Sequence, residues 1–309
     1  MKIIKRIFAI LLTFLIAVAL GFGLNLLLED NPMKVKWDDT VGTIQTDFSY
    51  ADGEKNKFDL YLPTSKNKET YGLVVYLHAG GFTTGDKSDD ASILKFFTSK
   101  GYVSAGINYT LRTDKNNASV LQMSNEIKEA VPKVVEKAKE LGYPIDRMAI
   151  MGGSAGGTLA LLYAYRDGKD APVPIKFVFE QVGPPSFEPN DWYYIGTDSN
   201  AAAVWVELMS GVKTTSEMIE NGTYKEALKP ISAYEWIDDN SPPLLCGYGK
   251  LDKIVPFAST KPLQEALKKH NVKSDFFVFP HSGHALHRDK EVSKAMFEAL
   301  ENYLKTYLQ

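Results

Sequence analysis

Residues 151–157 read M-G-G-S-A-G-G, which places one serine, Ser154, among four glycines. The stretch follows an apolar run at 148–151 and precedes a helix-like segment. A serine on a tight turn between a strand and a helix needs small neighbours, because the turn strains its backbone and brings strand and helix close together. The stretch therefore predicts a strand–turn–helix unit with Ser154 as a nucleophile. A nucleotide-binding turn is the competing interpretation, but it requires G-x-G-x-x-G or G-K-[ST], and neither is present.

Short apolar runs alternate with helical segments on both sides of this unit. The alternation predicts an α/β fold with a doubly wound, mostly parallel sheet of about eight strands. The candidate strands are 42–50, 57–62, 73–78, 102–109, 147–151, 176–182, 243–248 and 275–279, after a polar linker of roughly ten residues. The candidate helices are 91–100, 120–141, 155–166, 260–270 and 290–307. Pro132 falls inside the second helix, where it predicts a kink or a break.

Residues 183–234 interrupt the alternation and predict a helical, cap-like insertion. Two interpretations of its aromatic residues stay open, because insertions near a sheet's carboxyl edge often shape pockets, whereas a single aromatic ring usually belongs to a core. Either the rings line a substrate pocket, or they form the core of an extra subdomain. The aromatic residues in question are Trp192, Tyr193, Tyr194 and Trp205.

A serine hydroxyl needs a base, an acid that orients the base, and donors for the oxyanion. Downstream strands end just before Asp252 and His284, and an upstream strand ends at His78-Ala-Gly-Gly. The amides of Gly80 and Gly81 have no side chains to block them and are candidate oxyanion donors. The order serine, aspartate, histidine is the one that the doubly wound hydrolase sheet uses. These elements together favour a catalytic triad.

The chain resembles the α/β-hydrolases of the esterase/lipase group, above all those with an H-G-G-G oxyanion loop, over roughly residues 45–309. The resemblance implies Ser154 as nucleophile, His284 as general base and acid, and Asp252 as the orienting carboxylate. It also implies an oxyanion hole made by the amide of Ala155 with that of Gly80 or Gly81. The segment N-Y-T-L-R at 108–112 is similar to the family's N-Y-R-L. Ala79 departs from the family, which usually has glycine there, and this leaves the loop's backbone geometry open.

The C-terminal part offers other histidines. His281, His284 and His287 are spaced by three, but Ser282 and Gly283 argue against a helix, and no paired carboxylates or cysteines complete a metal site. The Gly283-His284 pair matches the family's G-H, so His284 is expected as the base and His281 is the reserve. No metal and no cofactor are expected.

Other polar residues near the predicted site have simpler explanations. His78 is expected to brace the oxyanion loop through hydrogen bonds. Asp86 and Lys87 are expected in a solvated turn or as a brace for that loop. Asp238 and Asp239 precede the seventh strand and so lie at the wrong end of the sheet. The single cysteine, Cys246, lies in an apolar strand and is expected to be buried and inert.

The N-terminus predicts export. Residues 7–28 form an uncharged run that is long enough, as a helix, to cross a hydrocarbon core of about 30 Å. Lys2, Lys5 and Arg6 precede the run and place the following domain outside the cytoplasm. We expect residues 1–30 to be an uncleaved anchor in the cell membrane and residues 31–309 to be the hydrolase domain. A cleaved signal peptide ending near Ala17-Val18-Ala19 is the alternative, and it would make the protein secreted.

The expected function is hydrolysis of small, short-chain carboxylic esters through an acyl-enzyme. Amide or peptide hydrolysis, as in prolyl-peptidase relatives, is the alternative, although those enzymes usually carry a large extra N-terminal domain. A non-catalytic surface binding protein on the same scaffold is a third hypothesis, but no member of the triad is missing. A formal net charge of −3 gives no electrostatic reason to expect a nucleic-acid partner.

Overall fold

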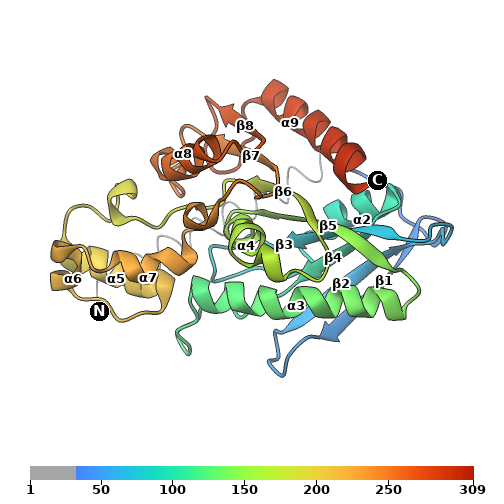
Figure 1. Ribbon diagram of the computed structural model, residues 1–309, viewed down its shortest axis with the longest axis horizontal. Coiled ribbons are helices and arrows are strands. Elements are labelled where there is room, and N and C mark those ends of the chain that lie inside the picture. Colours follow the sequence, from blue (N-terminus) through green and yellow to red (C-terminus); the bar gives the residue numbers. More distant parts are fainter. Residues whose placement is uncertain (1–32) are drawn as a thin grey trace.

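The computed structural model describes residues 33–309, which build one eight-stranded sheet between two layers of helices (Figure 1). The strand order is β1-β2-β4-β3-β5-β6-β7-β8. Strand β2 runs antiparallel to its two neighbours, and the remaining pairs are parallel. The strands are β1 (Gly42–Ser49), β2 (Lys57–Pro63), β3 (Tyr71–Leu77), β4 (Val103–Ile107), β5 (Ile145–Gly153), β6 (Ile175–Gln181), β7 (Leu244–Gly249) and β8 (Ser274–Phe279). The predicted fold class is confirmed, with all eight strands where the sequence pattern placed them.

The central strands β3 and β4 carry almost only apolar residues because helices cover both faces of the sheet. Every residue of β3 and of β4 is buried. Continuous apolar strands are typical of parallel sheets covered on both sides, whereas alternating strands face solvent on one side. The pairing of β3 with β5 sets Leu77 opposite Gly152. This register brings the loop after β3 beside the Ser154 turn.

The helices divide between the two faces. Helices α2 (Ala91–Ser99) and α9 (Lys290–Tyr303) pack on one face, and α3 (Val120–Glu140), α4 (Ala155–Leu162) and α8 (Lys261–Lys269) contribute to the core on the other. Helix α3 runs through Pro132 without interruption, so the alternative of a break is wrong. Pro132 is exposed, while Val131 and Val134 beside it are buried. The backbone carbonyl that proline leaves unbonded is therefore on the side of the helix that water reaches.

The insertion between β6 and β7 carries three helices, α5 (Ser199–Ser210), α6 (Ser216–Asn221) and α7 (Lys225–Leu228), which project to the left of the sheet in Figure 1. Trp192 and Trp205 are buried, with ring centroids 4.7 Å apart. Their indole N–H groups donate to the carbonyls of Ser186 and Phe187. These two rings form the core of the insertion, whereas the Tyr193 side chain is 64% exposed.

The segment before β1 packs against the domain. Val35 and Trp37 pack against the apolar cluster on the α2 side, where the Trp37 ring meets Tyr61 edge-on at 6.4 Å. The predicted linker is thus docked through alternate, partly buried side chains, whereas residues 38–40 that follow them are exposed. Among residues 33–309, no helix combines the length and apolarity that a membrane span requires. The predicted anchor, residues 1–30, lies outside the described residues.

Candidate active site

Ser154 lies on a sharp turn between β5 and α4. Its backbone has φ 52° and ψ −120°, a conformation that residues with a side chain adopt only under constraint. The Ser154 amide donates to the carbonyl of Gln181 at 2.8 Å, which ties the turn to the end of β6. The turn holds the hydroxyl at the carboxyl edge of the sheet, as the sequence predicted.

The glycines around Ser154 are required by close backbone contacts. A Cβ atom at Gly156 would lie 1.9 Å from the carbonyl oxygen of Leu77, and one at Gly152 would lie 2.4 Å from the carbonyl oxygen of Gly156. A Cβ atom at Gly157 would lie 3.1 Å from the Cα of Gly183. Gly153 differs, because its Cβ would meet only the Tyr76 hydroxyl, at an ordinary 3.6 Å. Three of the four glycines therefore serve packing of the turn, and contact does not explain the fourth.

The structure brings Ser154, His284 and Asp252 together in one hydrogen-bonded chain. His284 Nε2 lies 2.9 Å from Ser154 Oγ, and His284 Nδ1 lies 2.7 Å from Asp252 Oδ2. All three side chains are buried. Because Nδ1 faces a carboxylate that can only accept, Nδ1 carries the proton and Nε2 is free to accept the serine proton. This arrangement can deprotonate the hydroxyl during attack on an acyl group.

Asp252 is fixed by its own loop. Its second oxygen, Oδ1, accepts hydrogen bonds from the amides of Ile254 at 2.8 Å and Val255 at 3.0 Å. The loop packs closely on the histidine loop, since a Cβ at Gly249 would lie 2.5 Å from the carbonyl oxygen of Gly283. Both oxygens of the carboxylate are therefore bonded, and its plane cannot rotate freely.

The reserve base, His281, does not approach the serine. Its Nδ1 bonds Asp289 Oδ1 at 2.8 Å, and its side chain is 79% exposed. The other oxygen of Asp289 accepts the hydroxyl of Ser282 at 2.6 Å, and this hydroxyl in turn accepts the amide of Arg288. Asp289 thus braces the loop that carries His284. Sequence reasoning missed it, because nothing in the spacing distinguishes it from other acids of this segment.

The candidate oxyanion donors lie on a loop with unusual backbone geometry. Gly80, Gly81 and Phe82 have consecutive positive φ values of 130°, 58° and 65°. The amides of Gly80 and Gly81 donate to no backbone acceptor in residues 33–309. Ala155 is the first residue of α4, where an N–H group has no partner within the helix. These three amides remain the predicted donors. Ala79 lies outside the run of positive φ, so the loop accommodates its methyl group.

Asn108 and Tyr109, which follow β4, hold the oxyanion loop through hydrogen bonds and ring stacking. The Tyr109 ring stacks on His78 at 4.3 Å, and its hydroxyl donates to the His78 carbonyl at 2.8 Å. Asn108 accepts the amide of Lys87 and donates to Asp86. His78 itself donates from Nδ1 to the carbonyl of Ala79 at 2.7 Å. The predicted bracing role of His78 is therefore seen in the geometry, and so is that of Asp86.

Lys87 is not in a solvated turn. Its ammonium lies 3.0 Å from Asp47 and 3.1 Å from Asp59, and its side chain is only 8% exposed. Burial works against the charge, but the two carboxylates outweigh it and raise the pKa of Lys87. The ammonium instead ties the segment after the oxyanion loop to Asp47 of β1 and Asp59 of β2.

A buried acid beneath the turn escaped the sequence reasoning. Glu180 is fully buried in β6, and burial raises the pKa of its carboxyl to about 8. Its Oε2 accepts the amide of Gly183 at 2.9 Å, and its Oε1 has no hydrogen-bond partner among the described residues. The Gly183 backbone in turn packs on Gly157 of α4. Glu180 therefore supports the packing of the serine turn in its protonated form.

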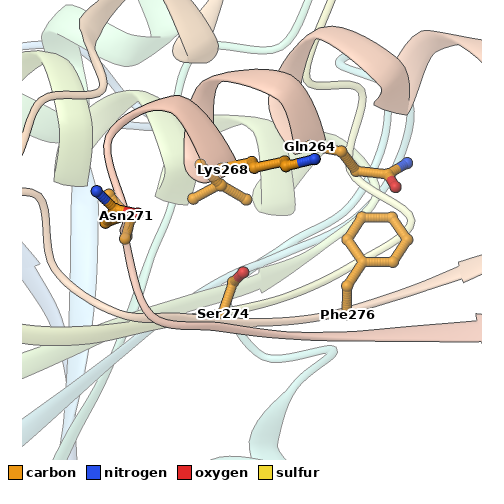
Figure 2. A pocket seen from close by; sticks show the side chains of 7 residues that line it. Gln264, Lys268, Asn271, Ser274 and Phe276 are labelled. Atoms are coloured by element: carbon orange, nitrogen blue, oxygen red, sulfur yellow. The ribbon is translucent and has the colours of Figure 1, made fainter.

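A pocket of about 420 Å³ lies away from this site, between α8 and β8 (Figure 2). Gln264 and Lys268 reach it from the helix, and Ser274 and Phe276 reach it from the strand. None of the predicted site residues lines it. Residues 33–309 contain no cluster of three or more histidine, cysteine or acidic side chains placed to hold a metal ion. Cys246 is buried, and burial raises the pKa of its thiol well above the usual value.

Comparison with solved structures shows the same fold in several esterases. A structure titled esterase B from Lactobacillus rhamnosis has a TM-score of 0.71 at 18% identity and covers 98% of this chain and 96% of its own. A truncated carbohydrate esterase from gut microbiota has a TM-score of 0.68 at 18% identity, with coverage of 86% and 98%. The predicted α/β-hydrolase fold is confirmed by these likenesses.

The curated sequence relatives are longer proteins, and this chain matches only part of each. The acylamino-acid-releasing enzyme of Mus musculus is 24% identical over 277 residues, which are 85% of this chain but 35% of that protein. Esterase LipI of Mycobacterium tuberculosis is 27% identical over 116 residues, 37% of this chain and 35% of the relative. The chain thus spans about a third of the length of the curated relatives that it matches.

Most of the chain matches the sequence profile of one protein family. The profile of the BD-FAE family matches residues 58–267, from β2 into α8. The match includes the oxyanion loop, the serine turn, the insertion and Asp252. With this match and the α/β-hydrolase sheet, the chain belongs to the BD-FAE family.

Proposed function

We propose that the chain is a serine hydrolase that cleaves carboxylic esters of small substrates through an acyl-enzyme. The observation that carries the proposal is the buried hydrogen-bonded chain from Ser154 through His284 to Asp252. In it, Ser154 is the nucleophile, His284 the general base and then acid, and Asp252 the group that orients the imidazole. The esterases among the similar proteins support this chemistry.

The reaction follows from the proton positions. Ser154 Oγ attacks the ester carbonyl carbon while His284 Nε2 takes its proton. The carbonyl oxygen gains a negative charge, which the amide of Ala155 and that of Gly80 or Gly81 stabilise. The C–O bond then breaks, and the alcohol leaves with the proton from Nε2. Water gives a proton to Nε2 and attacks the acyl group; that proton returns to Oγ as the acid departs. No cofactor takes part in these steps.

Amide hydrolysis is the second candidate, because the relatives named acylamino-acid-releasing enzyme match most of this chain. We favour esters because esterase LipI and several similar structures carry that description. As substrates we propose small soluble esters, including acyl esters of sugars, with support from the similar structure titled as a carbohydrate esterase.

The test compares the parent with Ser154→Ala on p-nitrophenyl esters from acetate to palmitate and on aminoacyl p-nitroanilides. We expect turnover that is fastest on the short esters and that falls by several orders of magnitude in Ser154→Ala. Faster turnover of anilides would favour the amide candidate. Absence of both activities, with no labelling of Ser154 by a fluorophosphonate, would contradict the proposal.

We also propose that the domain is exported and that residues 1–30 hold it at the cell membrane, outside the cytoplasm. The apolar run at 7–28 and the basic residues before it support this placement.

A further inference from the structure

The loop that carries Asp252 is held from two directions. On one side, Asp252 Oδ1 accepts the amides of Ile254 and Val255. On the other side, two tyrosines of the insertion donate to carbonyls of the same loop: Tyr193 to Lys253 at 3.1 Å and Tyr194 to Ile254 at 2.9 Å. The contacts join residues 60 positions apart in the chain.

The two sets of hydrogen bonds share the same peptide groups. The Lys253 carbonyl and the Ile254 N–H belong to one planar peptide, and the Ile254 carbonyl and the Val255 N–H belong to the next. Each tyrosine hydroxyl therefore donates to one end of a peptide whose other end donates to Asp252. A hydrogen bond to the carbonyl polarises the peptide and strengthens its N–H as a donor. It also fixes the orientation of the peptide plane.

The Tyr194 side chain is packed more tightly than that of Tyr193. Its ring meets Trp192 edge-on at 5.8 Å and Trp205 at 6.3 Å, both in the core of the insertion. Burial raises the pKa of the Tyr194 hydroxyl, and the nearby Tyr193 and Asp252 raise it further. The hydroxyl therefore remains a proton donor throughout any assay range. Tyr193 lies mostly in solvent, where water competes for the same carbonyl.

We propose that Tyr194 is a positioning residue for Asp252, acting through the Ile254–Val255 peptide, and that Tyr193 adds a weaker bond of the same kind. In this proposal, the insertion sets the orientation of the Asp252 carboxylate through the Tyr194 hydroxyl. The inference rests on the proposed function for its effect on turnover, but its effect on the Asp252–His284 hydrogen bond is independent of the substrate.

The test uses the full chain with Tyr194→Phe, which keeps the ring and removes only the hydroxyl. The matched control is Tyr224→Phe, because Tyr224 lies in the same insertion and donates to Glu188, away from the acid loop. One readout is steady-state turnover of p-nitrophenyl acetate, with active sites counted by fluorophosphonate titration. The second is the downfield NMR resonance of the proton on His284 Nδ1, assigned by its loss in His284→Ala.

We expect Tyr194→Phe to lower kcat by about three- to tenfold with KM unchanged, the range that one lost hydrogen bond allows. Tyr193→Phe should lower kcat by about twofold at most. The downfield resonance should shift or broaden in Tyr194→Phe and stay in place in Tyr224→Phe.

Unchanged kcat and an unchanged resonance in Tyr194→Phe would overturn the inference. Equal losses in Tyr194→Phe and Tyr224→Phe would also overturn it, since they would point to general loosening of the insertion. If the parent protein showed no hydrolysis that depends on Ser154, the proposed function would be contradicted. The NMR resonance alone would then decide the role of Tyr194.

Discussion

The buried carboxyl of Glu180 makes the free energy of unfolding depend on pH. Its carboxyl has a pKa of about 8 in the folded protein, against an ordinary value of 4.5. Between these values the unfolded chain loses a proton that the folded chain keeps. The free energy of unfolding therefore falls as pH rises through this window, and the contribution levels off above it. The carboxyl accepts the Gly183 amide beneath the serine turn, a bond that favours the charged form and only partly offsets the effect of burial on the pKa.

We therefore predict that the free energy of unfolding of Glu180→Gln, relative to that of the parent, increases as pH rises. Glutamine keeps an acceptor for the Gly183 amide and does not titrate. Melting temperatures of both proteins, measured from pH 5 to pH 8.5, give the comparison. The gap between them should widen steadily up to about pH 8. A gap that stays constant across the range would show that Glu180 does not change its protonation on unfolding.

The residues of the proposed triad were predictable from the sequence, whereas the residues that support them were not. Ser154, Asp252 and His284 each follow an apolar strand, so the parallel sheet brings them to one edge. Asp289 and the tyrosines at 193–194 act through contacts across loops that only the folded chain brings together. A local pattern carries no signal for such contacts, because neither periodicity nor spacing encodes which loops meet.

At the scale of elements, the strand–turn–helix unit of β5 and α4 makes unequal demands on its glycines. A side chain at Gly156 would collide with the backbone at the end of β3, which cannot move without displacing the sheet. A methyl group at Gly153 would fit beside the Tyr76 hydroxyl, and the backbone there does not have a positive φ. The motif G-x-S-x-G therefore contains positions of very different tolerance.

We predict that Gly156→Ala costs several kcal/mol of stability or prevents folding, the scale of a severe overpacking change. Gly153→Ala, its matched control, should stay within about 1 kcal/mol of the parent. Chemical denaturation of the two variants supplies the measurement. Equal losses in the two variants would mean that the turn depends on backbone freedom at both positions and not on the contact with Leu77.

The sequence predicted the elements well and their ends less well. Strand β4 ends at Ile107, two residues before the predicted end, because Asn108 and Tyr109 leave the sheet to brace the oxyanion loop. Tyr109 is as buried as the strand residues before it, so its hydrophobicity alone could not show that it lies in a loop. The insertion was predicted from the loss of alternation, but the division of its aromatic rings between core and surface required the packed structure.

At the scale of the whole molecule, the docked N-terminal stretch limits how far the domain can stand from a membrane. Val35 and Trp37 pack on the α2 side of the sheet. The apolar run of the proposed anchor ends at Leu28, so six residues lie between it and Val35 and the chain makes seven residue-to-residue steps. At about 3.5 Å per residue, the tether reaches at most about 25 Å. An anchored domain would therefore lie close to the lipid surface with its α2 side nearest.

This geometry sharpens the prediction for localisation. In fractionated cells of the native host, we expect the full-mass chain in the membrane pellet. After the wall is removed, external protease should reach and cut it, because the proposed orientation places the domain outside the cytoplasm. Replacing residues 33–37 with a flexible Gly-Ser stretch of the same length should speed release of an intact domain into the supernatant. A shortened chain in the medium of untreated cells would contradict the anchor and show that the run up to Leu28 is removed as a signal peptide.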